Sequence, residues 1–267
     1  MSAKTIPGTG TNPELAFKID HNGQPVFRGR AYSTADRRIR VRLEEGFDTV
    51  LLVGEAGSGR TTLLSALAAD LGSTQPVLHF ERSPLNRLEA LGRWGEIAAA
   101  AEVSRHIVVI IDDADQLPVE MLVAAHDARL AEDGVRVQFV LGAKPSSSER
   151  LLGVATSLDD AMAFCGLGWL DEDEVAPFVV HRLSTAGVDP GLFTREAAAQ
   201  VAIYASGCPR LVNLICAKAC FVAQLNHEAR VSASSVEEAA FVLRISALPA
   251  ARESVDPDGA EESRSAA

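Results

Sequence analysis

The sequence predicts an α/β fold with a parallel sheet, followed by a second domain built only of helices. In the first part of the chain, short continuous apolar runs alternate with segments long enough for crossover helices. Such runs are typical of parallel strands that are buried on both faces. From Leu170 onward the apolar residues recur at helical spacing instead, and no strand-like run is evident.

Four runs of aliphatic and β-branched residues are the expected strands, and a weaker run is a candidate fifth. The four are 49–53 (TVLLV), 76–80 (PVLHF), 107–111 (IVVII) and 137–141 (VQFVL), and the fifth is 161–165. The helices expected in the second domain span 171–185, 194–205, 209–225 and 233–245. Thr194 is expected to cap the second of these helices, because a threonine oxygen can accept a hydrogen bond from a free backbone N–H of the first turn.

We expect four parts along the chain. Residues 1–30 are rich in Gly, Pro, Thr and Asn with weak periodicity and are expected to form an N-terminal arm. Residues 31–168 are the α/β domain and 169–246 the helical domain. Residues 247–267 are acidic and poor in large apolar side chains, so a disordered tail is expected there.

The composition excludes several classes of protein. With 47% hydrophobic and 23% charged residues, the chain is of ordinary globular composition and not disordered throughout. The net charge of −11 disfavours a general nucleic-acid coat or a membrane-surface binder. No apolar run approaches the ~18 residues that a membrane span needs. Four cysteines and a start without an apolar signal region predict a reducing, cytoplasmic setting.

A glycine-rich stretch between the first strand and the next helix predicts a phosphate-binding loop. It has the spacing G-x-x-x-x-G-[K]-[ST], apart from one position. Gly57 and Gly59 are expected to let backbone N–H groups turn toward an anion at a helix N-terminus, and Thr61 to bind Mg²⁺. The residues expected to bind ATP here are Gly54, Glu55, Ala56, Gly57, Ser58, Gly59, Arg60, Thr61 and Thr62.

Arg60 is the exception, because a lysine is expected at its position. Lysine offers a compact charge that reaches the transferred phosphate, whereas arginine offers a wide planar fork and is not a conservative replacement. Arginine still binds phosphate well. We therefore expect ATP binding to be retained more fully than fast hydrolysis.

The third strand ends in two carboxylates, Asp112 and Asp113. A strand-end aspartate in this chemistry holds Mg²⁺ through its water shell, which is the role expected of Asp112. Asp113 stands where a water-activating glutamate is common, and its side chain is one methylene shorter. The predicted enzyme is thus an ATPase, slowed by Arg60 and Asp113.

Several further segments resemble one branch of the AAA+ ATPases. They are 112–117 (DDADQL), 139–145 (FVLGAKP), 170–174 (LDEDE), 178–187 (FVVHRLSTAG) and 206–216 (SGCPRLVNLIC). The resemblance is to the ExeA, or general secretion pathway protein A, branch, to which the transposition ATPases of the TniB and MuB type are related, and it covers about 31–245. It implies a three-layer P-loop NTPase sheet with a C-terminal all-helical lid.

The resemblance also implies roles for residues outside the phosphate loop. Arg210 would be the sensor-2 arginine, which reaches from the lid to the γ-phosphate. Lys144 falls near the sensor-1 turn and would either touch the γ-phosphate or cap a strand. Arg150 would be either an arginine finger reaching into a neighbouring subunit or a plain surface residue, and Arg129 is a rival for the finger.

The partners implied are ATP, further copies of the chain in a homo-oligomer, and an unidentified protein. Two cellular roles compete: secretion or assembly, and a DNA transaction of the transposition type. Secretion relatives continue past the lid into a membrane helix and an envelope-binding module, whereas an acidic tail follows the lid in this sequence, so the secretion role does not transfer. A non-hydrolysing, nucleotide-gated scaffold is the alternative to an ATPase.

Two other groups of residues allow a functional and a structural interpretation. Arginines precede the first strand and form either a DNA-facing or subunit-facing patch, or a solvated helix face with Ile39, Leu43 and Phe47 turned inward. These are Arg28, Arg30, Arg37, Arg38, Arg40 and Arg42. Cys216 and Cys220 lie four residues apart on one expected helix, but no further ligands are suitably spaced for a metal, so we expect them to pack in a core.

Overall fold

The computed structural model describes residues 12–18, 25–80, 96–97, 99–100, 102–118, 134–158 and 161–246, and the single positions 120, 123 and 127. The tail expected over 247–267 and most of the expected arm lie outside the described residues. The chain divides into two compact units. An α/β unit runs from Tyr32 to Gly168, and a helical unit combines the described residues up to Ala31 with those from Trp169 to residue 246.

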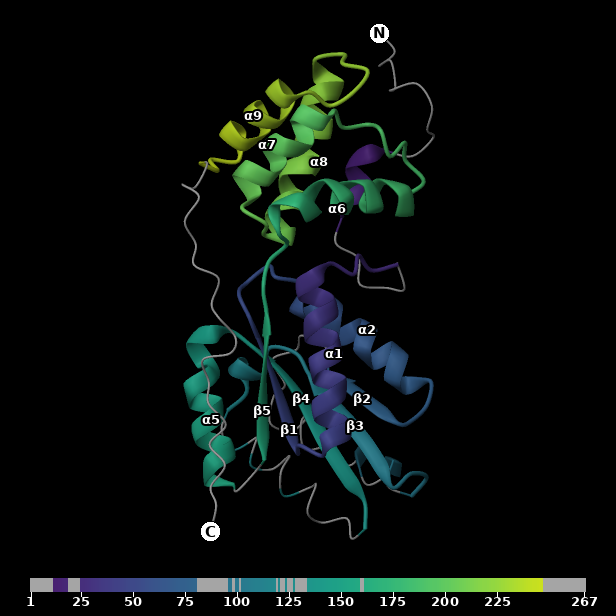
Figure 1. Cartoon of the computed structure of the whole chain (residues 1–267), viewed down its shortest axis with the longest axis vertical. Coiled ribbons are helices and arrows are strands. Elements are labelled where there is room, and N and C mark those ends of the chain that lie inside the picture. Colours follow the sequence, from purple (N-terminus) through teal and green to yellow (C-terminus); the bar gives the residue numbers. More distant parts are fainter. Residues whose placement is uncertain are drawn as a thin grey trace. The chain divides into compact units, whose positions relative to one another are not determined.

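The α/β unit is built on a parallel five-stranded sheet in the order β2-β3-β4-β1-β5 (Figure 1). The strands are β1 (Thr49–Gly54), β2 (Val77–Phe80), β3 (His106–Ile111), β4 (Arg136–Ala143) and β5 (Met162–Leu167). All four predicted apolar runs and the candidate fifth are strands. Because the strands are parallel, the ends of β1, β3 and β4 lie at one edge of the sheet, where α/β proteins bind ligands.

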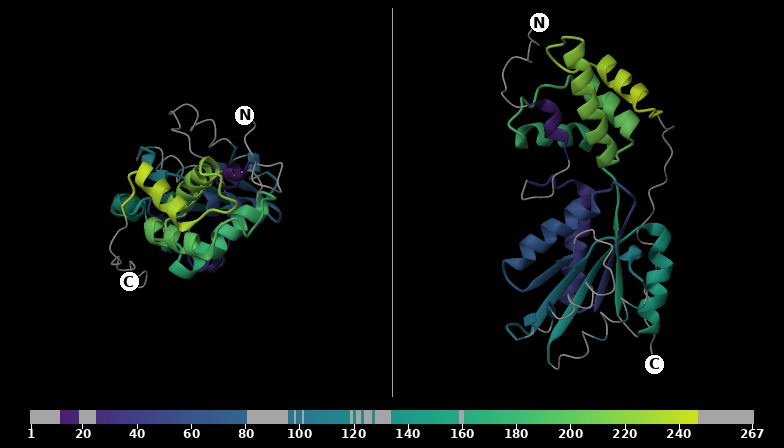
Figure 2. Two further views of the ribbon diagram at one scale, coloured as in Figure 1. Left: turned by 90° about the horizontal axis from the view of Figure 1, so that it is seen from above. Right: turned by 180° about the vertical axis from the view of Figure 1, so that it is seen from behind.

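Helices cover both faces of this sheet, as Figures 1 and 2 show from opposite sides. On one face α1 (Arg30–Glu45) and α2 (Arg60–Gly72) contribute Ile39, Leu43 and Leu63 to a core that includes Val50 and Leu52. On the other face, α5 (Ser148–Ser157) packs through its buried and partly buried apolar residues against alternate residues of β1, β3 and β4. The three-layer α/β fold predicted from the sequence is confirmed.

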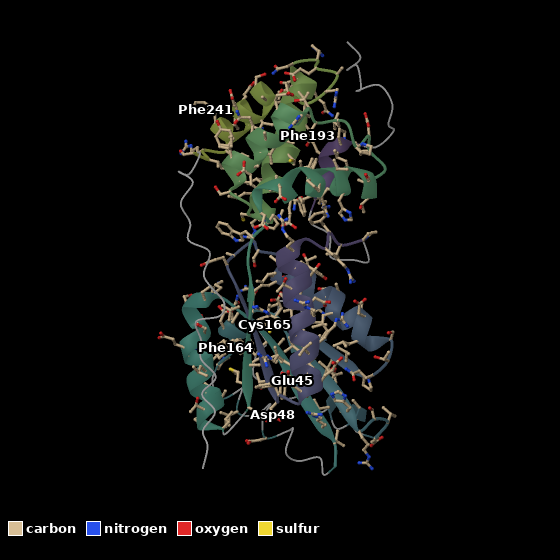
Figure 3. The ribbon with its side chains drawn as sticks, viewed as in Figure 1. Glu45, Asp48, Phe164, Cys165, Phe193 and Phe241 are labelled. Atoms are coloured by element: carbon tan, nitrogen blue, oxygen red, sulfur yellow. The ribbon has the colours of Figure 1, made fainter. Side chains whose placement is uncertain are left out.

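Strand β5 illustrates how alternation assigns residues to the two faces. Cys165 is buried in the core shared with α1 and α2, while its neighbour Phe164 is on the opposite face and partly exposed. Figure 3 labels both side chains. Successive side chains of a strand point to opposite faces, so β5 contributes Ala163, Cys165 and Leu167 to the interior.

The helical unit contains α6 (Glu172–Thr185), α7 (Arg195–Ala205), α8 (Pro209–Leu225) and α9 (Ala233–Val242), close to the predicted ranges. Thr194 caps α7 as predicted, since its side chain accepts a hydrogen bond from the backbone N–H of Ala197 at 3.1 Å. Helix α9 ends at Val242, before the predicted end. Arg244 then takes a left-handed conformation with φ of 56°, which a continuing α-helix does not allow.

The segment Pro13–Phe17 is a short 3₁₀ helix in the core of the helical unit, and not a detached arm. Phe17 is 3% exposed, and its ring meets that of Phe193 edge to face with centroids 5.8 Å apart. Arg182 also donates a hydrogen bond to the backbone oxygen of Lys18 at 2.6 Å. A five-residue segment is too short to show a hydrophobic period, so the sequence pattern did not reveal this packing.

Among the residues that the structure describes, no helix is both long enough and apolar enough to cross a membrane.

Candidate functional site

The predicted phosphate loop connects the end of β1 to the start of α2. Gly57 and Gly59 have φ of 91° and 98°, a left-handed backbone that favours glycine. Helix α2 begins directly after Gly59, and the N–H of Leu63 donates to the oxygen of Gly59 at 2.9 Å. The free N–H groups and the positive end of a 13-residue helix thus face the loop, as an anion site requires.

Ser58 provides an independent indication that the loop is shaped for a ligand. Its side chain is 6% exposed, and its Oγ has no hydrogen-bond partner among the described residues. A buried hydroxyl without a partner is unfavourable by about 1–3 kcal/mol. A phosphate oxygen bound in the loop is an acceptor of the kind that this hydroxyl lacks. The residues present therefore fit a phosphate group.

Arg60 is directed at two acceptors of the protein itself. Its Nη1 donates to the backbone oxygen of Gly54 at 2.9 Å, and its Nη2 donates to Oδ1 of Asp113 at 3.0 Å. The Arg60 side chain is 9% exposed and that of Asp113 is 20% exposed. The two residues at which this chain departs from the expected ATPase pattern thus form one largely buried ion pair.

Asp112 meets Thr61, the other residue predicted to bind Mg²⁺. The Thr61 hydroxyl donates to Oδ2 of Asp112 at 2.5 Å, and the N–H of Asp113 donates to Oδ1 at 2.9 Å. Asp112 is buried, and no cationic side chain among the described residues pairs with it. A carboxylate and a hydroxyl side by side supply the oxygen ligands that Mg²⁺ prefers.

The described residues hold no group of three or more His, Cys, Asp or Glu that could bind a metal by themselves. This agrees with the chemistry of Mg²⁺ in nucleotide sites. The ion there keeps several waters and is bound by one or two protein side chains together with phosphate oxygens.

Gly142 is a residue of the site that the sequence analysis missed. It lies in β4 beside β3, and a Cβ at this position would come within 3.0 Å of Oδ1 of Asp112 and 2.7 Å of Cδ1 of Leu64. Glycine therefore makes room for the carboxylate that is predicted to bind Mg²⁺. The available signal was a glycine inside an apolar strand, which often marks a close approach.

Asp113 begins the loop that follows β3 in an unusual conformation. Its φ and ψ are 50° and 40°, in the left-handed region, and a 3₁₀ turn over Ala114–Gln116 comes next. For a residue other than glycine this conformation costs on the order of 1 kcal/mol or more, so surrounding contacts must hold it. The ion pair with Arg60 is one such contact.

Lys144 and Arg150 both approach this loop. Lys144 follows β4, and its Nζ lies 3.9 Å from Oδ2 of Asp115. Arg150 on α5 donates from Nη2 to the backbone oxygen of Asp115 at 2.8 Å and from Nη1 to that of Leu117 at 3.2 Å. In the structure, the candidate finger Arg150 therefore contacts its own chain. The rival Arg129 lies outside the described residues.

Arg210 lies in the helical unit, exposed on the first turn of α8. Its guanidinium forms no hydrogen bond or ion pair with any other residue that the structure describes. Its reach to a nucleotide therefore stays a prediction.

At least three of the six arginines before the first strand form ion pairs with acids. Arg40 forms ion pairs with Asp36 and Asp70, both at 3.0 Å. Arg42 pairs with Glu45, which is labelled in Figure 3, at 2.8 Å. Arg30, which belongs to the helical unit, pairs with Asp171 and Asp173. Because Ile39 and Leu43 are buried as well, these contacts favour the solvated helix face over a DNA-facing patch.

The cysteines of α8 are packing residues, as predicted. Cys216 and Cys220 are both buried in the core of the helical unit. Burial raises the pKa of Cys220 to about 12 and raises that of Cys216 well above its ordinary value. Both thiols stay protonated at neutral pH, whereas the thiolate is the metal ligand.

Comparisons with known proteins agree with this geometry. Residues 50–141, from β1 into β4, match the family described as "ATPase family associated with various cellular activities (AAA)". The chain is 25% identical over 217 residues to the Holliday junction branch migration complex subunit RuvB of Corynebacterium jeikeium, covering 74% of this chain and 57% of that protein. It is 24% identical over 237 residues to general secretion pathway protein A of Aeromonas hydrophila, covering 79% and 43%.

Among solved structures, the fold resembles that of Cdc6p from Pyrobaculum aerophilum. The TM-score is 0.63 at 15% identity, and the match covers 86% of this chain and 70% of that chain. This likeness shows the fold alone. The chain spans about half the length of the two curated relatives. The α/β unit of this chain therefore has the three-layer parallel-sheet fold of P-loop NTPases, and its segment 50–141 is similar to the AAA family.

Proposed function

We propose that the chain binds ATP with Mg²⁺ at the loop 54–62 and hydrolyses it slowly. The contact between Thr61 and Asp112 carries this proposal, because it brings the predicted metal-binding oxygens of the loop and of β3 to 2.5 Å from one another. The N-terminus of α2 and the unpartnered hydroxyl of Ser58 support phosphate binding in the same loop.

The side chains divide the work between binding and proton transfer. Thr61 and Asp112 would hold the metal, which would neutralise charge that develops on the phosphate oxygens. Asp113 orients the attacking water and accepts its proton. One of its two oxygens already accepts from Arg60, which leaves a single oxygen for the water. Slow hydrolysis follows from this arrangement.

Binding of a fluorescent ATP analogue with Mg²⁺ tests the first half of the proposal. The parent should bind it, and Gly59→Val should not, because a β-branched residue is strained at φ of 98° and reshapes the loop. Gly187→Val in the helical unit also places valine at a left-handed glycine, with φ of 70°, and should bind like the parent. A parent that binds no nucleotide would refute the proposal.

A second candidate function is a nucleotide-gated scaffold that does not hydrolyse ATP. The ion pair between Arg60 and Asp113 favours it, because the two positions on which hydrolysis depends are engaged with one another. Steady-state phosphate release separates the two functions. If the parent releases phosphate faster than Asp113→Asn, the result supports the ATPase. If the parent releases phosphate no faster than that variant, the result supports the scaffold.

We further propose that ATP binding closes the helical unit as a lid and promotes a homo-oligomer, with Arg210 contacting the γ-phosphate. The guanidinium of Arg210 is exposed and has no hydrogen-bond or ion-pair partner among the described residues, which supports this role. Small-angle scattering should show a more compact or larger particle with a non-hydrolysable ATP analogue than with ADP. Arg210→Ala should lose that difference. Identical scattering of the parent with both nucleotides would contradict the lid mechanism.

The names of the relatives point to two cellular roles, DNA branch migration and general secretion. We propose that the chain uses the ATP cycle to remodel a partner or its own oligomer in one of these two settings. The two relatives match at nearly equal identity, and the pairing of the arginines of α1 with acids does not favour DNA. ATP turnover measured with and without branched DNA distinguishes the roles, because stimulation is expected only of a DNA-dependent ATPase.

A further inference from the structure

The loop after β3, residues 112–117, is held by side chains from two other elements of the α/β unit. We call it the acid loop, because three of its six residues are aspartates. Arg150 of α5 donates to two of its backbone oxygens, at Asp115 and Leu117. Lys144, after β4, faces the carboxylate of Asp115, which is 7% exposed.

The contacts of Arg150 fall where the acid loop needs support. Asp113 has a left-handed backbone, and the N–H of Gln116 donates back to the oxygen of Asp113 at 2.8 Å. The turn is therefore a closed unit whose shape fixes the direction of the Asp113 side chain. Arg150 binds the carbonyls two and four residues farther along, so it anchors the far side of that turn.

We propose that Arg150 is a positioning residue that acts on Asp113 of its own subunit through the backbone of the acid loop. Lys144 makes a second and weaker contact through Asp115. The proposal rests on the proposed ATPase for its effect on turnover. It departs from the expectation that Arg150 is a finger reaching into a neighbouring subunit. For that role, Nη1 and Nη2 of Arg150 would first have to break their hydrogen bonds to the acid loop.

The chemistry of the side chain explains why arginine suits this position. A planar guanidinium donates in two directions at once and can bridge two carbonyls, whereas an ammonium group on a flexible stem binds as a single point. Arg150→Lys should therefore anchor the loop in part, and Arg150→Ala should not anchor it. Glu149→Gln is the matched control, since Glu149 is the exposed neighbour of Arg150 on α5 and its carboxylate forms no hydrogen bond or ion pair with another described residue.

Hydrogen exchange of the full nucleotide-free chain tests the anchoring without any ATP chemistry. In Arg150→Ala the amides of residues 113–117 should exchange about tenfold faster than in the parent, and those of β1 and α2 should be unchanged. Arg150→Lys should fall between, and Glu149→Gln should match the parent. Unchanged exchange of 113–117 in Arg150→Ala would overturn the proposal, whatever the ATPase rate.

Kinetics then tests the effect on Asp113. Arg150→Ala should lower kcat about tenfold with KM within about twofold of the parent, and Arg150→Lys should recover part of the loss. When added to Asp113→Asn, the Arg150→Ala change should lower the residual rate no further, because a positioning residue has nothing left to position. A further tenfold fall in the double variant would overturn the proposal.

Mixing two defective proteins distinguishes action within a subunit from action between subunits. A mixture of Arg150→Ala and Asp113→Asn should turn over no faster than the average of the two variants measured alone, because each chain then has a defect in its own site. Recovery of turnover would show that an intact Arg150 completes a neighbour's site, and would overturn the proposal. A parent without any turnover would refute the proposed ATPase instead, and the exchange comparison would then decide the anchoring alone.

Discussion

Arg60 and Asp113 lie 53 positions apart in the sequence and form an ion pair, with Nη2 of Arg60 3.0 Å from Oδ1 of Asp113. The pair joins the start of α2 to the loop that follows β3. It explains together two departures from the expected ATPase pattern that are separate in the sequence. Arg60 is long enough to reach the carboxylate of Asp113. Asp113, which is one methylene shorter than the expected glutamate, is held by Arg60.

Replacing Arg60 by lysine should raise kcat while ATP binding is retained. A lysine ammonium cannot reach the oxygen of Gly54 and the carboxylate of Asp113 in the way the guanidinium does, so both oxygens of Asp113 become available to water. Phosphate release under saturating ATP measures the change. Turnover below that of the parent would show that the site depends on the ion pair.

The two neighbouring aspartates should differ in the step that they affect. Asp112→Asn should weaken Mg²⁺-dependent ATP binding, because Asp112 is the carboxylate in contact with Thr61. Asp113→Asn should keep the affinity for ATP within about twofold of the parent. It should lower the turnover by two or more orders of magnitude, since it removes the group that accepts the proton. Nucleotide affinity and phosphate release are measured on both variants. Equal losses of ATP affinity in both would contradict the division of roles.

Gly142→Ala should weaken the Mg²⁺ dependence of binding by displacing Asp112. The new Cβ would stand 3.0 Å from Oδ1 of Asp112 and 2.7 Å from a methyl carbon of Leu64, so one of them must move. Gly153→Ala is the control, because Gly153 lies on α5 and a Cβ at this position would meet no atom within 4 Å. In a helix that change should stabilise the fold by roughly 0.5–1 kcal/mol. An unchanged Mg²⁺ dependence in Gly142→Ala would show that β4 adjusts without moving Asp112.

Phe17→Ala should destabilise the helical unit, since the ring is 3% exposed and packs on Phe193. Truncation of a buried phenylalanine costs about 3–5 kcal/mol. Leu15→Ala in the same 3₁₀ helix is the control, because Leu15 is 56% exposed. This change should alter the free energy of unfolding by no more than about 0.5 kcal/mol. Urea denaturation followed by circular dichroism measures both. Equal stability of the two variants would contradict the inclusion of Pro13–Phe17 in the core.

The sequence predicted the sheet and the lid-like helices because their signals are local. Buried parallel strands are continuous apolar runs, and α8 shows its helical period over 17 residues. The left-handed turn at Gly57 and Gly59 before α2 was also predictable, since glycines at this spacing are what an anion-binding loop requires. The packing of Pro13–Phe17 was not predictable in the same way, because its partner Phe193 is far along the chain.

The connections within the site depend on three-dimensional features that no local pattern encodes. The pairing of Arg60 with Asp113 requires the left-handed backbone at Asp113, and nothing in the residues around Asp113 signals that conformation. The contacts of Arg150 require α5 to lie beside the acid loop, some 35 positions earlier in the chain. The residue types were therefore enough to predict that these side chains belong to the site. The residues that they contact could be identified only from the structure.

Titration calorimetry of the parent chain with ATP, in the presence and absence of Mg²⁺, tests the central claim most directly. The account predicts saturable binding that is tighter with Mg²⁺ than without it. It also predicts that Thr61→Ala removes most of this difference, because the hydroxyl beside Asp112 is lost. Absence of ATP binding by the parent, or binding of equal strength with and without Mg²⁺, would contradict the assignment of the loop 54–62 and Asp112 as a nucleotide and metal site.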